Sequence, residues 1–172
     1  MRDRLKEITE EDYWVHGLSE RDFYHIYDLV KKFISLSQAE VARESAEAVK
    51  NYPDSGINCE IISDISHYAW CEEQYLWEFC LWRLQGIFEG LFVNNYIDKM
   101  KYTNLVGLNA KIKAAKDCGF KISDEDVVEL KSWANLRNAL SHAPPEQYRP
   151  VPLEENDIIE YIELVKRILS GS

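Results

Sequence analysis

The sequence predicts an all-α fold, a helical bundle of five to six helices with an up-and-down core. Gly and Pro are sparse, with seven and five in 172 residues. They concentrate near residues 52–56, 117–119 and 144–152, and they leave long uninterrupted stretches in which apolar residues recur at helical spacing. Because 46% of the residues are hydrophobic, the chain can bury a full core, and we expect one domain over residues 1–172.

Two long helices make up the N-terminal half of the prediction. The first runs from about Glu20 to Val49 and the second from about Cys59 to Tyr96. The middle of the second, residues 75–84, is apolar nearly all round, which predicts a helix covered on more than one side. One of these sides is expected to face the core and another to contact a second subunit. Gly86 and Gly90 indicate either a close helix approach or a bend.

Three shorter helices follow. One spans about Leu105 to Asp117 and ends at Gly119, a residue suited to a left-handed cap. The next starts behind Ser123 and ends near His142, because Pro144 disfavours helical geometry at the residue before it. A closing helix runs from Glu154 to Leu169, and its apolar residues share one face.

The end of the fourth predicted helix carries the polar cluster that suggests chemistry. Arg137, Asn138, Ser141 and His142 lie within six residues, just before the helix stops. Asn138 shares a helix face with His142, and Ser141 shares one with Arg137, because residues four apart are neighbours on a helix. Arg137 and His142 are five apart and point in different directions on a regular helix. Unwinding at His142, or a second copy of the chain, would bring the two together.

The run from Arg137 to His142, late in an all-helical chain, resembles the Arg-x4-6-His motif of the HEPN superfamily, which often has Asn directly after the Arg. The resemblance implies a dimeric helical bundle that cleaves RNA without a metal or other cofactor, at a site shared by two subunits. It implies that His142 transfers protons and that Arg137 stabilises the phosphorane charge. Asn138 and Ser141 would orient or bind. Some family toxins have Tyr two residues after the His, where this chain has Pro144.

Other interpretations of the same residues stay open. An Arg and a His near a helix C-terminus also stabilise the helix dipole. HEPN domains include inactive members that only dimerise or bind, so a non-catalytic binding module is the second hypothesis. A metal-dependent hydrolase is the third: Asp22 and His25 on one helix, and Asp64 and His67 on the next, each have the spacing by which helical bundles hold metals.

The charge distribution limits the nucleic acids that can bind. The formal net charge is −10, which disfavours tight binding to long duplexes. Residues 96–150 are the least acidic part, with nine Lys and Arg against seven Asp and Glu. Phosphate contacts are therefore expected from basic residues near the motif, and a short or single-stranded RNA is the compatible substrate. These residues are Lys111, Lys113, Lys121 and Arg149.

Location and partners follow from simpler features. No apolar run follows the charged start of the chain, so we expect no secretory signal and a cytoplasmic protein. The four Cys form no Cys-x-x-Cys pair, which favours reduced thiols. The most apolar stretch, residues 75–93, contains Glu78, Arg83 and Glu89, so a membrane span is not expected. A homodimer is the expected assembly, and a protein inhibitor and a role in defence stay open.

Overall fold

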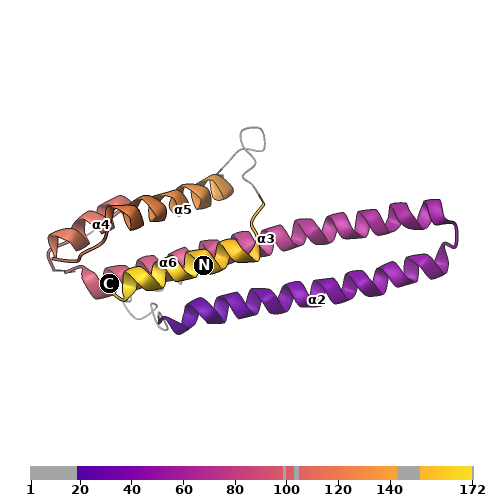
Figure 1. The fold of residues 1–172 in the computed structure, drawn as a ribbon, viewed down its shortest axis with the longest axis horizontal. Coiled ribbons are helices and arrows are strands. Elements are labelled where there is room, and N and C mark those ends of the chain that lie inside the picture. The colour runs from indigo at the N-terminus through magenta and orange to yellow at the C-terminus, as the bar shows by residue number, and fades with distance from the viewer. Residues whose placement is uncertain (1–18, 99, 103–104, 143–151, 172) are drawn as a thin grey trace, which may run out of the picture.

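The computed structural model describes residues 19–98, 100–102, 105–142 and 152–171, and this part of the chain is all-helical (Figure 1). The predicted fold class is confirmed. All five predicted helices are present, with starts that shift by up to four residues. They are α2 (Arg21–Asn51), α3 (Ser55–Tyr96), α4 (Leu108–Asp117), α5 (Asp124–His142) and α6 (Glu155–Leu169).

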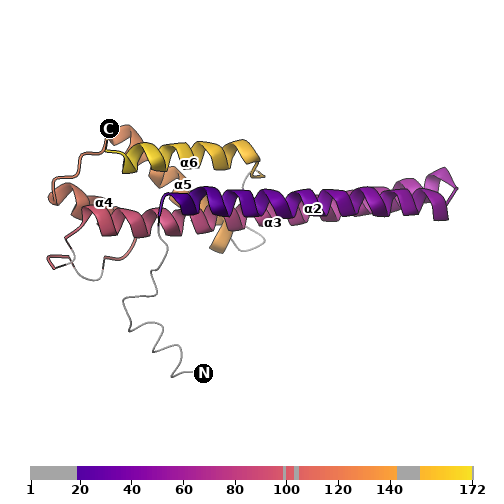
Figure 2. The ribbon, with the colours of Figure 1, turned by 90° about the horizontal axis from the view of Figure 1, so that it is seen from below.

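Helices α2 and α3 form a long antiparallel hairpin, and the other helices cover only one half of it (Figures 1 and 2). The turn between them is capped by Asp54, whose side chain accepts a hydrogen bond of 2.8 Å from the Gly56 amide. The segment before α6 joins α3 at Gln74, whose side-chain amide exchanges two hydrogen bonds with the Leu153 backbone. The part of the hairpin between this junction and the turn therefore projects beyond the bundle.

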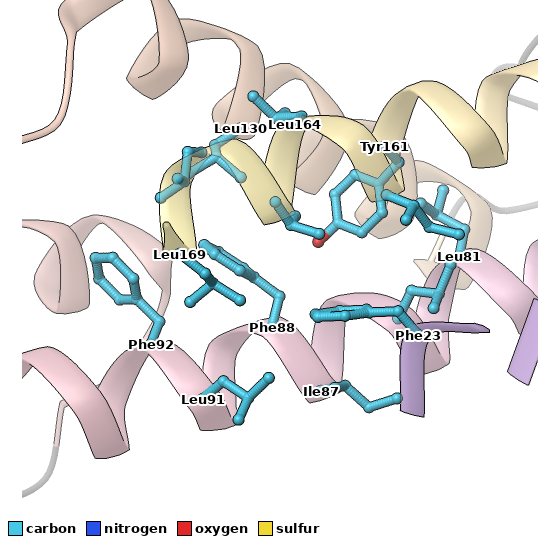
Figure 3. Close-up of a cluster of buried hydrophobic side chains, with 14 of the residues drawn as sticks. Phe23, Leu81, Ile87, Phe88, Leu91, Phe92, Leu130, Tyr161, Leu164 and Leu169 are labelled. Atoms are coloured by element: carbon cyan, nitrogen blue, oxygen red, sulfur yellow. The ribbon is translucent and has the colours of Figure 1, made fainter. Parts of the chain in front are cut away.

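All five helices contribute to one hydrophobic core (Figure 3). Helix α3 supplies the largest share because three elements pack against its second half. Its buried side chains include Trp77, Leu81, Leu84, Phe88 and Phe92, and they meet Phe23 of α2, Leu130 of α5 and Ile158, Tyr161 and Val165 of α6. Burial of this apolar surface is the main force that holds the bundle together.

Local signals fix the ends of the shorter helices. Gly119 follows α4 with φ of +92°, a conformation that Gly adopts without strain, as the sequence predicts. The Ser123 hydroxyl caps α5 by accepting a hydrogen bond of 3.0 Å from the Asp126 amide. On the surface of the bundle, Glu155 at the start of α6 accepts hydrogen bonds from Tyr27 and Lys31 of α2. These contacts fix α6 along the hairpin.

Two further expectations concern α3. A Cβ added at Gly86 would meet no heavy atom within 4 Å, so Gly86 does not serve a close approach between helices within the described chain. None of the described helices has the length and apolar character needed to cross a membrane.

Candidate functional site

Arg137 lies on α5 and turns its side chain toward α3. Its Nε donates a hydrogen bond of 3.1 Å to the side-chain oxygen of Gln85, and its Nη2 is 3.8 Å from a carboxylate oxygen of Glu89. The side chain is 26% exposed. The guanidinium is thus held along one edge while part of it is still open to solvent.

Gln85 fixes this geometry from the core side. It is the one buried polar residue within the described part of the chain, with 4% exposure. Its amide nitrogen donates a hydrogen bond of 2.9 Å to the backbone oxygen of Trp133, while its amide oxygen accepts from Arg137. Both polar ends of Gln85 therefore bind α5, and the Arg137 position follows from the packing of two helices.

Glu89 lies between two cations. One carboxylate oxygen pairs with Arg137, and the other accepts a hydrogen bond from Lys111 of α4. Burial raises the pKa of the nearby Tyr161 hydroxyl well above its ordinary value, and the negative charge of Glu89 adds to this effect. The predicted phosphate contact Lys111 is thus engaged in an ion pair that joins α4, α3 and α5.

A pocket of about 200 Å³ opens beside the Arg137 guanidinium, between α3 and the end of α5. Ser141 and Leu140 line it from α5, and aromatic side chains line it from α3. The α3 residues are Tyr75, Glu78, Phe79 and Trp82. Burial raises the pKa of Glu78. The pocket combines one cation, one carboxyl group, the hydroxyl groups of Ser141 and Tyr75, and three exposed aromatic rings, a combination suited to an anionic ligand with a planar group.

The structure brings two of the predicted motif residues together. Arg137 and Ser141 line the same pocket, as expected for residues four apart. Asn138 is exposed on α5 and is not among the pocket-lining residues. Helix α5 is described as far as His142, and the residues that follow, on which the predicted stop depends, lie outside the described part of the structure, as does the His142 side chain.

The predicted phosphate contacts do not gather around Arg137. Lys113 is exposed on α4, and Lys121 lines a different pocket, of about 560 Å³, together with Asn95 and Gly119. Arg149 lies outside the described residues. Of the three that the structure describes, Lys111 is linked to Arg137 through their shared partner Glu89.

Gln85 and Glu89 are the site residues that the sequence analysis missed. A signal for them exists: they are polar, lie four residues apart, and interrupt the most apolar stretch of the chain. A buried polar group needs a partner, so such a pair predicts a polar contact from another helix. It does not predict which helix supplies that contact.

The structure separates the residues of the metal hypothesis. Ser37 of α2 contacts Glu72 of α3, so the antiparallel register puts Asp64 and His67 opposite residues 42–45. That region is about twenty residues from Asp22 and His25, roughly 30 Å along a helix. The two pairs do not face one another, and no group of three or more His, Cys, Asp or Glu among the described residues is arranged to hold a metal ion.

Comparisons with protein-family models, with curated proteins and with solved structures gave no match for this chain.

Proposed function

We propose that this chain is a metal-independent endoribonuclease of the HEPN type, which cleaves single-stranded RNA by attack of the 2′-hydroxyl at a site completed by a second subunit. The observation that carries the proposal is the placement of Arg137. The side chain of this motif Arg is held by Gln85 and lines a pocket, on the same helix as His142.

The proposed chemistry assigns one role to each group. The ribose 2′-oxygen attacks phosphorus and forms a P–O bond, and its proton passes to a base. The P–O5′ bond then breaks, and the leaving 5′-oxygen gains a proton. His142 would serve these proton transfers, because an imidazole titrates near neutral pH. Arg137 would stabilise the extra negative charge on the phosphorane oxygens.

The pocket walls suit a single-stranded substrate. Tyr75 and Trp82 expose about half or more of their surface beside Arg137, so an unstacked base can lie against a ring while its phosphate meets the guanidinium. A duplex keeps its bases stacked and offers no such contact. Among the described residues, the pocket lining contains a single cation, Arg137, which also suits a short single strand better than a duplex.

One observation favours a second candidate, a HEPN-like module that dimerises or binds without catalysis. Glu89 pairs with Arg137, and Glu78 lines the same pocket. Two carboxyl groups near one guanidinium weaken its attraction for a phosphate. The Arg137 contacts would then serve mainly to hold α5 on α3.

The test is cleavage of a single-stranded RNA by the full chain in EDTA. We expect products with a 2′,3′-cyclic phosphate, no cleavage of the same sequence as DNA, and no cleavage when every 2′-hydroxyl is methylated, because each change removes the nucleophile. Arg137→Ala and His142→Ala are each expected to lower the rate at least about hundredfold, the size typical of lost acid–base or charge stabilisation.

Lys131→Ala is the matched control. Lys131 is an exposed cation on the same helix, away from the pocket, and its loss should leave the rate within about twofold. If wild type and both motif variants cleave equally, or if folded wild type does not cleave RNA in any of several sequences, the ribonuclease proposal is wrong. The non-catalytic module is then the better description.

A further inference from the structure

A stripe of exposed aromatic side chains runs along α3 on the side away from the core. Tyr68, Tyr75, Phe79 and Trp82 are 69%, 68%, 45% and 54% exposed. Together with Ile65, Glu72 and Gly86 they follow one another at alternating intervals of three and four residues, from 65 to 86. We call these seven residues the α3 seam.

This spacing is typical of a helix that packs against another helix along its length. Intervals of three and four keep side chains on one face, as in coiled coils. Gly86 lies at the end of this face, and a Cβ added there would meet no heavy atom within 4 Å. The backbone of a second helix can therefore approach α3 closely at Gly86. None of the described helices covers the four aromatic rings of the seam, although contiguous apolar surface of this kind usually marks an interaction site.

We propose that the α3 seam packs antiparallel against the α3 seam of a second copy of this chain. The two-fold axis would pass near residue 77, so that residue i of one copy lies opposite residue 154 − i of the other. Seam residues then meet seam residues, for example Phe79 and Tyr75 of the partner subunit. Arg83 lies beside Glu72 of the partner subunit, and this pair occurs twice.

Charge complementarity supports both the partner and the register. Arg83 is exposed beside the seam, and within the described residues it forms no ion pair. Glu72 is exposed between Tyr68 and Tyr75, and among the described residues it contacts only the Ser37 hydroxyl, at 3.5 Å. An antiparallel pair joins these opposite charges. A parallel pair in register would put Glu72 against Glu72 and Arg83 against Arg83, which repel each other.

The acidity of the projecting hairpin supports the same direction. Residues 36–72 carry seven Asp and Glu against two Lys and Arg. In the antiparallel register this end of α3 lies along the opposite end of the partner's α3, so the two acidic ends are far apart. A parallel pair would bring them together, at a cost that low salt would increase.

The pairing would also complete the Arg137 pocket. Tyr75, Phe79 and Trp82 belong both to the seam and to the pocket wall, so a second helix on the seam closes one side of the pocket. It also brings two Arg137 pockets to one interface, on either side of the two-fold axis. Only this use of the interface for RNA cleavage rests on the proposed function; the pairing itself does not.

Reversal of the two charges tests the register. Molar mass is measured by sedimentation over a range of concentrations at low salt. We expect a wild-type dimer, and at least about tenfold weaker association for Glu72→Arg and for Arg83→Glu, because each puts like charges together twice. The double variant, with both charges exchanged, should recover most of the lost affinity. Phe79→Arg should be monomeric.

Glu60→Arg and Lys32→Glu are the matched controls, because each makes the same charge change at an exposed position away from the seam. Circular dichroism checks that each variant is folded. If Glu72→Arg does not fold, Glu72→Gln and Arg83→Gln replace the reversed pair, with a smaller weakening expected from each.

The inference is overturned if wild type is monomeric at all concentrations, or if the seam variants associate like their controls. It is equally overturned if the double variant is no better than the single ones. A dimer that responds to the charges as expected but does not cleave RNA leaves the pairing intact and contradicts only the ribonuclease proposal. Undiminished cleavage by a monomeric Phe79→Arg contradicts the shared site.

Discussion

The two sides of α3 have similar side chains and opposite surroundings. On one side Leu81, Leu84 and Phe88 are buried under α2, α5 and α6, and on the other Tyr75, Phe79 and Trp82 stand in solvent. Each unit of apolar area has the same unfavourable free energy in water on either side of the helix. The comparison shows that a single chain leaves part of the apolar surface of α3 uncovered.

The polar residues of α3 divide in the same way. Gln85 and Glu89 face α5 and contact Arg137. Glu72 in the seam and Arg83 beside it have, among the described residues, no partner in another helix except the Ser37 hydroxyl that contacts Glu72. Polar groups on the covered side therefore fix one helix against another within the chain. Those beside the seam are available to select a partner.

The largest expected effect separates the two sides by stability. Phe88→Ala should lower the free energy of unfolding by about 3–5 kcal/mol, because a fully buried ring leaves a cavity. Trp82→Ala should cost the isolated subunit under about 1 kcal/mol, because an exposed ring has few contacts to lose. Both substitutions are made in the Phe79→Arg variant, at a concentration where that variant is monomeric. Urea unfolding then measures the difference between their free energies of unfolding.

An equal loss in the two variants would contradict the comparison, because it would mean that the exposed side of α3 is packed within one chain. Tyr68→Ala is a second exposed-side variant that guards against an effect peculiar to Trp82, and its expected cost is equally small.

The next effect concerns the link between α3 and α5. Gln85→Leu removes the partner of Arg137 Nε and of the Trp133 oxygen, and we expect a loss of about 1–3 kcal/mol, the range for buried polar groups left without partners. Asn135→Leu, the same type of change at an exposed position of α5, should stay within about 0.5 kcal/mol. Thermal unfolding of the two variants measures the contrast.

If the wild type cleaves RNA, the cleavage rate of Gln85→Leu can be compared with its folded fraction at the assay temperature. A rate that falls more than the folded fraction would show that Gln85 positions Arg137. A loss of stability with unchanged cleavage would show that Gln85 only joins two helices.

The sequence predicted the elements well because helix signals are local. The Ser123 cap and the Gly119 turn each act within a few residues, and the structure begins α5 and ends α4 there. The apolar middle of α3 likewise predicted a helix with more than one apolar side. Which side the chain covers depends on where α5 and α6 return, and that is a property of long-range packing.

The candidate site was predicted less completely for the same reason. Arg137 and Ser141 share a pocket because they are four apart on one helix, a relation that sequence spacing contains. The Arg137 partners Gln85 and Glu89 lie some fifty residues earlier in the chain, and Asp22 and Asp64 of the metal hypothesis lie far apart along the hairpin. Spacing within one helix does not report the register between two.

The smallest effect compares two carboxyl groups by pH. The hydrogen bond from Lys31, with that from Tyr27, lowers the pKa of Glu155 below its ordinary value of 4.5, so Glu155 stabilises the fold above pH 4.5 and loses this contribution as the pH falls. Burial raises the pKa of Glu78, so its charged form destabilises the fold, and stability is lost as the pH rises from 4.5 through the raised pKa. Glu155→Gln should therefore lower stability at pH 7, and Glu78→Gln should raise it.

Both differences should disappear well below pH 4.5, where the wild-type carboxyls are protonated. Each should stay below about 1 kcal/mol, because water screens groups that are partly exposed. Urea unfolding at a series of pH values measures them at protein concentrations where the wild type is monomeric, so that association does not contribute. Opposite signs at pH 7 would confirm that Glu155 joins α6 to the hairpin through an ion pair, while Glu78 has no cationic partner among the described residues. Equal signs would mean that the surroundings of Glu78 hold a compensating cation, and Arg137, which lines the same pocket, could supply it.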